Sequence, residues 1–132
     1  MPESQSINAM TDRIIALRDK LQWKRFHTPT QISLTMQVEL GKLYQEFMWR
    51  TDDQIYEQVS TKLDQKERVS EQIADVLLNL LILAKELKID LTQSVSDKLT
   101  SMEKQYTADI YKGKAKTDVQ SSLQSISEND RK

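Results

Sequence analysis

The stretch VLLNLLILA, residues 76–84, is apolar at every position except Asn79. A helix over this stretch is apolar on nearly all sides, which is typical of the most buried helix of a small protein. Nine residues are about half of what a helix needs to cross a membrane, so the stretch does not predict a membrane span. We therefore expect the fold to be built around a buried helix over residues 66–88.

Three further segments carry apolar residues at spacings of three and four, the pattern of one helix face. They cover residues 7–21, 29–49 and 90–106. The polar segment of residues 51–67 predicts an additional short helix that carries Ile55, Val59 and Leu63. Thr28 before Pro29 is a typical helix start. The predicted core positions of the first two helices are Ile7, Met10, Ile14, Leu17 and Leu21, then Ile32, Met36, Leu40, Leu43 and Phe47. No segment shows a strand pattern, so the fold class is all-α, a four-helix bundle.

The length of 132 residues fits one domain with a single core. We expect an all-α domain over residues 1–107 and a polar, flexible tail over residues 108–132. A helix that is apolar on all sides has more surface than the other helices of so short a chain can cover. The sequence therefore predicts that oligomerisation completes the bundle.

Composition and charge exclude several classes of function. The chain has no cysteine, which excludes disulfides, thiolate metal sites and thiol nucleophiles. Its net charge of −1 gives no field that would attract nucleic acid or an anionic membrane. The first ten residues, MPESQSINAM, lack the pattern of a signal peptide. We expect a cytoplasmic protein that binds neither nucleic acid nor membrane.

Two stretches carry a family resemblance: WKRFHTPTQISLTMQVELGKLYQEFMWR, residues 23–50, and EQIADVLLNLLILAKELKIDL, residues 71–91. They resemble the MazG-like nucleoside triphosphate pyrophosphohydrolases, and within them the dCTP pyrophosphatase-like subgroup. The resemblance implies an all-α homodimer or homotetramer that hydrolyses nucleoside triphosphates to the monophosphate and pyrophosphate. It also implies magnesium as cofactor, held by Glu-x-x-Glu on one helix and Glu-x-x-Asp on the next long helix.

The chain departs from this pattern at two of the four metal positions, which hold Glu39 and Lys42, then Gln72 and Asp75. The four positions together carry a charge of −1, because Lys42 offsets one of the two carboxylates. An ammonium about 4 Å from a divalent ion repels it by about 8 kcal/mol at an effective dielectric of roughly 20. The departure predicts weak magnesium binding and a catalytically impaired relative.

Two alternatives remain open from the sequence. Glu71, one turn before Asp75, could complete an irregular metal site with Glu39, in which case the enzyme is active. The chain could also be a structural or regulatory helical module without a ligand. Lys42 either bridges Glu39 and Asp75 or extends into solvent.

The resemblance also indicates substrate-binding candidates. Trp49 and Trp23 correspond to family aromatics that flank a nucleobase, although packing is the alternative for both and the more typical use for Trp23. His27 either contacts the nucleotide or shapes the loop before Pro29. Tyr106 retains a family position on the last helix, and Lys42 is a further candidate for substrate binding.

Overall fold

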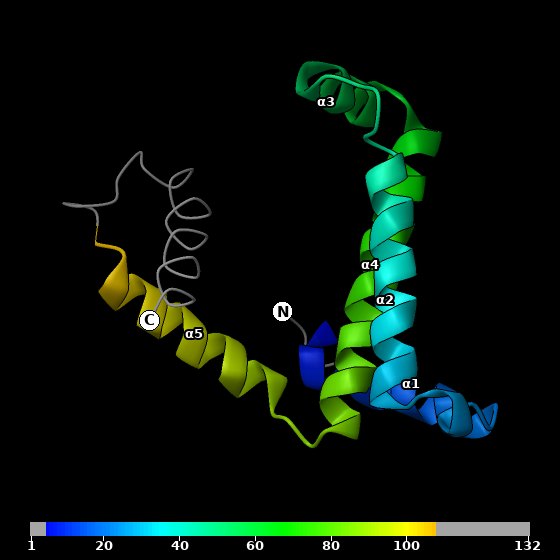
Figure 1. Ribbon diagram of the computed structural model, residues 1–132, viewed down its shortest axis with the longest axis vertical. Coiled ribbons are helices and arrows are strands. Elements are labelled where there is room, and N and C mark those ends of the chain that lie inside the picture. The colour runs from blue at the N-terminus through cyan, green and yellow to red at the C-terminus, as the bar shows by residue number, and fades with distance from the viewer. Residues whose placement is uncertain (1–4, 108–132) are drawn as a thin grey trace, which may run out of the picture. The chain divides into compact units, whose positions relative to one another are not determined.

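The computed structural model describes residues 5–107, and every regular element in this range is a helix (Figure 1). The elements in chain order are α1 (Ile7–Lys20), the 3-10 helix η2 (Lys24–Phe26), α2 (Pro29–Gln45), α3 (Asp52–Thr61), α4 (Leu63–Glu86) and α5 (Leu91–Gln105). The all-α prediction is confirmed, and the additional short helix is α3. The predicted tail over residues 108–132 lies outside the described residues. Among the residues described, no helix is long and apolar enough to span a membrane.

Helix starts follow from capping side chains. Ser6 Oγ accepts the backbone N–H of Ala9 at 3.1 Å at the start of α1. Thr28 caps α2, with Pro29 at its first position as predicted. Thr51 and Gln54 form a capping box before α3, in which each side chain accepts the other's backbone N–H. These bonds satisfy N–H groups that have no partner inside the helix.

Three described residues that follow helices adopt the left-handed conformation, and none of the three is glycine. Gln22 follows α1 with φ 57°, Trp49 follows α2 with φ 64° and Lys88 follows α4 with φ 57°. After α1, the N–H of Trp23 donates to the carbonyl of Arg18 at 2.9 Å, which closes the last turn. Each left-handed residue costs about 1–2 kcal/mol relative to the right-handed conformation. Packing elsewhere in the fold must offset this cost at each of the three positions.

The chain divides into two units, Met1–Thr92 and Gln93–Lys132. In the first unit α2 lies along α4, with α3 at one end of the pair and α1 near the other (Figure 1). The fully or nearly buried apolar residues are Ile32, Val69, Leu81, Ile82 and Ala84. Four of these five are on α4, so the prediction that this helix is the most buried element is confirmed.

Several predicted core positions are exposed. Leu17 and Leu21 on the α1 side are 45% and 43% exposed, and Leu40 of α2 is 49% exposed. In their place the charged Arg18 is buried, with 6% of its surface exposed. Periodicity identifies an apolar face but does not identify what covers it, so these three core assignments are wrong for the single chain.

In the second unit, α5 is amphipathic. Its apolar residues Val95, Leu99 and Met102 are between 41% and 52% exposed. Gln93 Nε2 donates to Asp97 Oδ1 at 2.8 Å, one turn along the same helix.

Candidate functional site

A cavity of about 280 Å³ lies in the first unit between α1, the loop before α2, α2 and α4. Its polar lining residues are Arg18, His27, Glu39, Asp75 and Asn79. Three of the residues predicted from the sequence, Glu39, Asp75 and His27, therefore meet in one cavity. The two carboxylates come from different helices, α2 and α4, which lie side by side.

One face of α4 forms the floor of the cavity. Asp75, Leu78, Asn79 and Ile82 line it, at spacings of three and four that place them on one side of a helix. The Asn79 amide nitrogen donates to the carbonyl of Asp75 at 2.9 Å, one turn back. The floor extends about 10 Å from Asp75 to Ile82, at a rise of about 1.5 Å per residue. It is polar at the Asp75 end and apolar at the other.

Lys42 lies beside Glu39 at the edge of the cavity. The Lys42 Nζ to Glu39 Oε1 distance is 3.4 Å, one turn along α2. The Lys42 side chain is 53% exposed and that of Glu39 is 16% exposed. Lys42 thus pairs with Glu39 from the solvent side. Within the described residues it makes no ion pair with Asp75, so it does not bridge the two carboxylates.

The remaining predicted metal positions do not complete a metal site. Gln72 Oε1 is buried without a hydrogen-bond partner. Glu71 is exposed and does not line the cavity. Across residues 5–107, no three His, Cys, Asp or Glu side chains are arranged to hold a metal ion. The carboxylates of the cavity are therefore a pair, Glu39 and Asp75.

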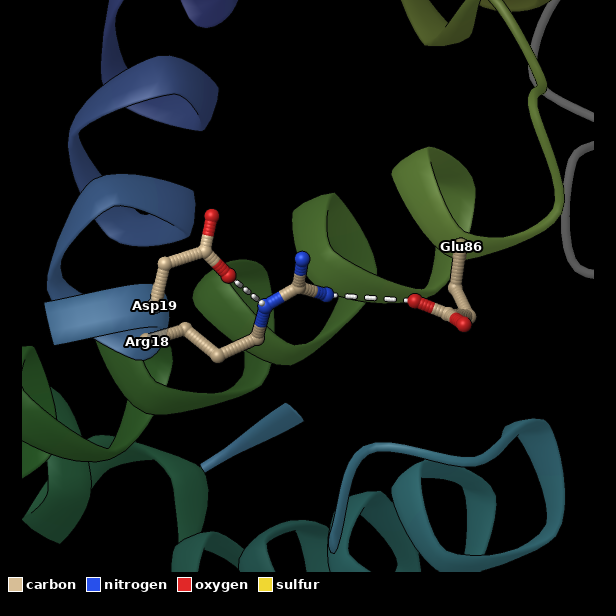
Figure 2. Close-up of polar contacts among 3 residues, drawn as sticks. All are labelled: Arg18, Asp19 and Glu86. Atoms are coloured by element: carbon tan, nitrogen blue, oxygen red, sulfur yellow. Dashed lines mark hydrogen bonds and ion pairs between the residues drawn. The ribbon is translucent and has the colours of Figure 1, made fainter. Parts of the chain in front are cut away.

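Arg18 was not identified from the sequence, yet it lines the cavity. Figure 2 shows its side chain in contact with Asp19 and Glu86. Its Nε donates to Asp19 Oδ1 at 3.2 Å, and its Nη1 donates to Glu86 Oε2 at 3.1 Å. The second contact joins α1 to the end of α4. Arg18 follows Ile14 by four residues, so it shares a helix face with a predicted core residue. That spacing is the one signal in the sequence that could have located it.

His27 lines the cavity next to Arg18. Its Nδ1 is buried and has no partner among the described residues. Burial lowers the pKa of His27 below its ordinary value of 6.5; the charge of Arg18 lowers it further, and the charge of Glu86 opposes the shift. The imidazole is therefore neutral near pH 7.

The aromatic candidates are placed differently from one another. Trp23 lines the cavity and is 45% exposed, so it is available to a ligand and is not a core residue. Trp49 follows α2, is 95% exposed and does not line the cavity. Tyr106 belongs to the second unit, after α5, and is described apart from the cavity.

Comparison with known proteins identifies the family of this chain. The MazG-like family profile matches residues 34–118. The chain is 30% identical over 116 residues to dCTP pyrophosphatase 1 of Mus musculus, covering 86% of this chain and 65% of that protein. It is 29% identical over 107 residues to dCTP pyrophosphatase 1 of Homo sapiens, covering 81% of this chain and 61% of that protein. The chain thus spans slightly less than two thirds of the length of these relatives.

The fold is also similar to a solved structure. The crystal structure of a pyrophosphatase from Archaeoglobus fulgidus DSM 4304 superimposes with a TM-score of 0.65 and 31% sequence identity. The match covers 72% of this chain and 86% of that protein. The family profile includes both Glu39 and Asp75 of the cavity. This chain belongs to the MazG-like family.

Proposed function

We propose that this chain is a nucleotide pyrophosphohydrolase of reduced activity. The reaction is the hydrolysis of a nucleoside triphosphate by one water molecule to the nucleoside monophosphate and pyrophosphate. The observation that carries the proposal is the pair Glu39 and Asp75, brought from two helices into one cavity, with Lys42 paired to one of them. The names of the relatives support a pyrophosphatase, and the paired lysine supports the reduced activity. A cytoplasmic location, expected from the sequence, is part of this proposal.

The cavity fits a divalent cation when the substrate supplies part of its coordination. Magnesium in phosphate-binding sites takes one or two carboxylates, several waters and phosphate oxygens. Glu39 and Asp75 supply two carboxylates, and no third carboxylate, histidine or cysteine in residues 5–107 joins them. Such an ion would neutralise the charge of the triphosphate when bound. The chain's own contribution is to hold the two carboxylates on adjacent helices.

The exposure of Lys42 decides how large the impairment is. The figure of about 8 kcal/mol expected from the sequence assumes a partly buried ammonium about 4 Å from the ion. Lys42 is 53% exposed, so solvent screens its charge. At the dielectric of water the same repulsion is about 2 kcal/mol, or about thirtyfold in affinity. We therefore expect metal binding to be weakened and not abolished.

The irregular-site alternative has less support. It requires Glu71 to join Glu39 and Asp75, but Glu71 is exposed and does not line the cavity. One residue before Gln72, it also points about 100° away from that position around the helix. We keep Glu71 as a residue to be tested and not as a metal ligand.

We also propose that the chain forms a homodimer or a homotetramer. The apolar face of α4 formed by Ile73, Leu77 and Leu80 is 40% to 54% exposed in the single chain. Leu34 and Val38 of the neighbouring α2 are 52% and 57% exposed. Side chains of this size are rarely exposed together on a monomeric protein, so a second copy is the occupant that we expect.

Pyrophosphate release tests the proposed activity. Purified protein is incubated with a panel of ribo- and deoxynucleoside triphosphates, with magnesium and separately with manganese. The mouse dCTP pyrophosphatase 1 is assayed in parallel to confirm that the conditions are suitable. We expect slow release that rises with metal concentration and falls at least tenfold in Asp75→Ala, because one of two carboxylates is removed.

The matched control is Glu71→Ala, which removes an exposed carboxylate one turn away on the same helix. Unchanged activity in this variant supports a site made of Glu39 and Asp75 alone. Equal loss in both variants supports the irregular site. No release from any triphosphate while the mouse enzyme is active would contradict the proposed activity and favour a binding or regulatory module.

A further inference from the structure

The wall of the cavity that α1 forms is a fixed guanidinium. Arg18 is 6% exposed, and the carboxylates of Asp19 and Glu86 hold its Nε and Nη1. Figure 2 shows that neither of these contacts involves the third nitrogen, Nη2. Nη2 has no hydrogen-bond partner among the described residues. Arg18 therefore presents a planar donor group whose orientation is set before any ligand binds.

The charge around Arg18 is unsuited to a phosphate. The carboxylates of Asp19 and Glu86 offset the guanidinium and leave a local charge of −1. The adjacent His27 adds no positive charge near pH 7, because burial and Arg18 lower its pKa. Because these carboxylates offset its charge, the guanidinium is better suited to donate a hydrogen bond to an uncharged acceptor than to bind a phosphate.

The position of Arg18 separates it from the carboxylate end of the cavity. Asp75 lies at one end of the α4 floor, and Glu86, which holds Arg18, is eleven residues further along α4. At about 1.5 Å per residue this is about 16 Å along the helix axis. A ligand with its charged end near Asp75 therefore extends its uncharged end towards Arg18. Trp23 and Ile82 supply aromatic and apolar walls there, which suit a flat ring.

We propose that Arg18 is a specificity residue, whose Nη2 donates to a carbonyl oxygen of the nucleobase. Cytosine, uracil, thymine, guanine and hypoxanthine carry such an oxygen. Adenine carries an amino group at the corresponding position instead, which would leave Nη2 of Arg18 without that acceptor. Arginine makes the same kind of contact with base oxygens when it reads nucleic acid. The inference rests on the proposed function, since it takes the ligand of this cavity to be a nucleotide.

Uncharged nucleosides test the base contact without metal or phosphate. Inosine and adenosine form a matched pair, because they differ only at position 6 of the purine, an oxo group against an amino group, and in the proton that inosine carries on the adjacent N1. Binding is followed by NMR at the indole N–H of Trp23, which lines the cavity. The indole of Trp49, which is 95% exposed and outside the cavity, is the internal control. Trp49→Phe assigns the two signals.

We expect inosine to bind about tenfold or more tightly than adenosine, the effect of one hydrogen bond to a charged donor. Arg18→Lys keeps a positive charge for Glu86 but lacks the planar third nitrogen, so the preference should fall to about twofold or less. The control is Arg13→Lys, an exposed arginine of the same helix. It should leave the preference unchanged.

The results separate this inference from the proposed function. Equal binding of inosine and adenosine by the natural protein overturns the role of Arg18, as does a preference that survives Arg18→Lys. The absence of any shift at Trp23 with every nucleoside also overturns it. Pyrophosphate release from triphosphates is measured independently, so the proposed activity can hold while this inference fails.

Discussion

Individual side chains decide how much positive charge the cavity can accept. Glu39 and Asp75 each contribute −1, Lys42 contributes +1 and Gln72 contributes nothing, so the four positions that the sequence predicts as metal positions carry −1. The buried Gln72 Oε1 lacks a hydrogen-bond partner among the described residues. An unpaired buried acceptor costs about 1–3 kcal/mol, so Gln72 is a local defect at a position where the resemblance to the family predicts a carboxylate.

Restoring both carboxylates should restore metal binding. Lys42→Glu combined with Gln72→Glu changes the charge of the four positions from −1 to −4. We expect magnesium affinity to rise at least tenfold, because a repelling ammonium is removed and two oxygen ligands are added. Isothermal titration calorimetry with magnesium chloride, in the absence of nucleotide, measures the change.

The control for total charge is Lys98→Glu combined with Gln105→Glu, two exposed positions of α5. This variant changes the net charge by the same amount as the site variant. If it gains magnesium affinity equally, the effect is general electrostatics. No gain in the site variant would show that Lys42 and Gln72 are not the metal positions.

His27 predicts a pH dependence of stability. Burial lowers its pKa in the folded protein, with a further contribution from Arg18 and an opposing one from Glu86. The unfolded chain has the ordinary value near 6.5 and binds more protons below that pH. The free energy of unfolding should therefore decrease as pH falls below about 6.5. Because His27 is the only histidine, no other imidazole contributes.

Urea unfolding of the natural protein and of His27→Gln measures this effect. The natural protein should lose more stability than the variant between about pH 7.5 and about pH 5.5. We compare the difference in free energy of unfolding between the two proteins at each pH. The contributions of carboxylates that titrate in both proteins largely cancel in this difference. An equal loss in both proteins would contradict a lowered pKa of His27.

The sequence located only part of the cavity at this scale. Glu39, Asp75 and His27 follow from family motifs, and the structure brings them together. Arg18 was missed because its burial depends on Glu86, which is 68 positions away in the sequence. Trp49 was chosen from its motif, but it lies beyond the end of α2 in a left-handed conformation, and its side chain is 95% exposed. Local patterns do not contain such long-range pairings or backbone conformations.

At the scale of helices, local sequence signals predicted which segments are helical, but they predicted the ends of the helices less well. The apolar periodicity predicted the helices, and Thr28 before Pro29 fixed the start of α2. The predicted end of α2 near residue 49 is too late, since regular helix stops at Gln45. The residues after it are turns, and Trp49 is left-handed without being glycine. A stop that uses glycine would have been visible in the sequence.

The way in which α1 ends explains how this helix contributes to the site. α1 ends with the N–H of Trp23 bonded to the carbonyl of Arg18 at 2.9 Å. Trp23 and Arg18, which this turn links, both line the cavity. The Arg18 to Glu86 contact then fixes this end of α1 against α4. The cavity wall is therefore a consequence of how one helix ends.

At the scale of the whole molecule, a single copy of the chain leaves more apolar surface exposed than is usual for a monomeric protein. In the first unit the buried apolar core consists of five residues, whereas apolar residues of both α2 and α4 are substantially exposed. The sequence predicted this excess from the all-round apolar character of residues 76–84. It could not identify the exposed face, because that depends on where α2 packs.

Polar substitutions on this face should dissociate the proposed oligomer. Size-exclusion chromatography with light scattering measures the mass in solution, and one chain has a mass of 15.4 kDa. We expect two or four times that mass for the natural protein, and close to one chain for Ile73→Glu combined with Leu77→Glu. Charges buried between two apolar surfaces lose their hydration, whereas the same charges on a monomer remain in water.

The control is Ser96→Glu combined with Thr100→Glu, which adds the same two charges at exposed polar positions of α5. It should keep the mass of the natural protein, because no apolar contact is removed. A natural protein that elutes as one chain would show that this face is not an interface between copies. An oligomer that survives both charges on α4 would place the interface elsewhere, with the α2 residues Leu34 and Val38 as the next positions to change.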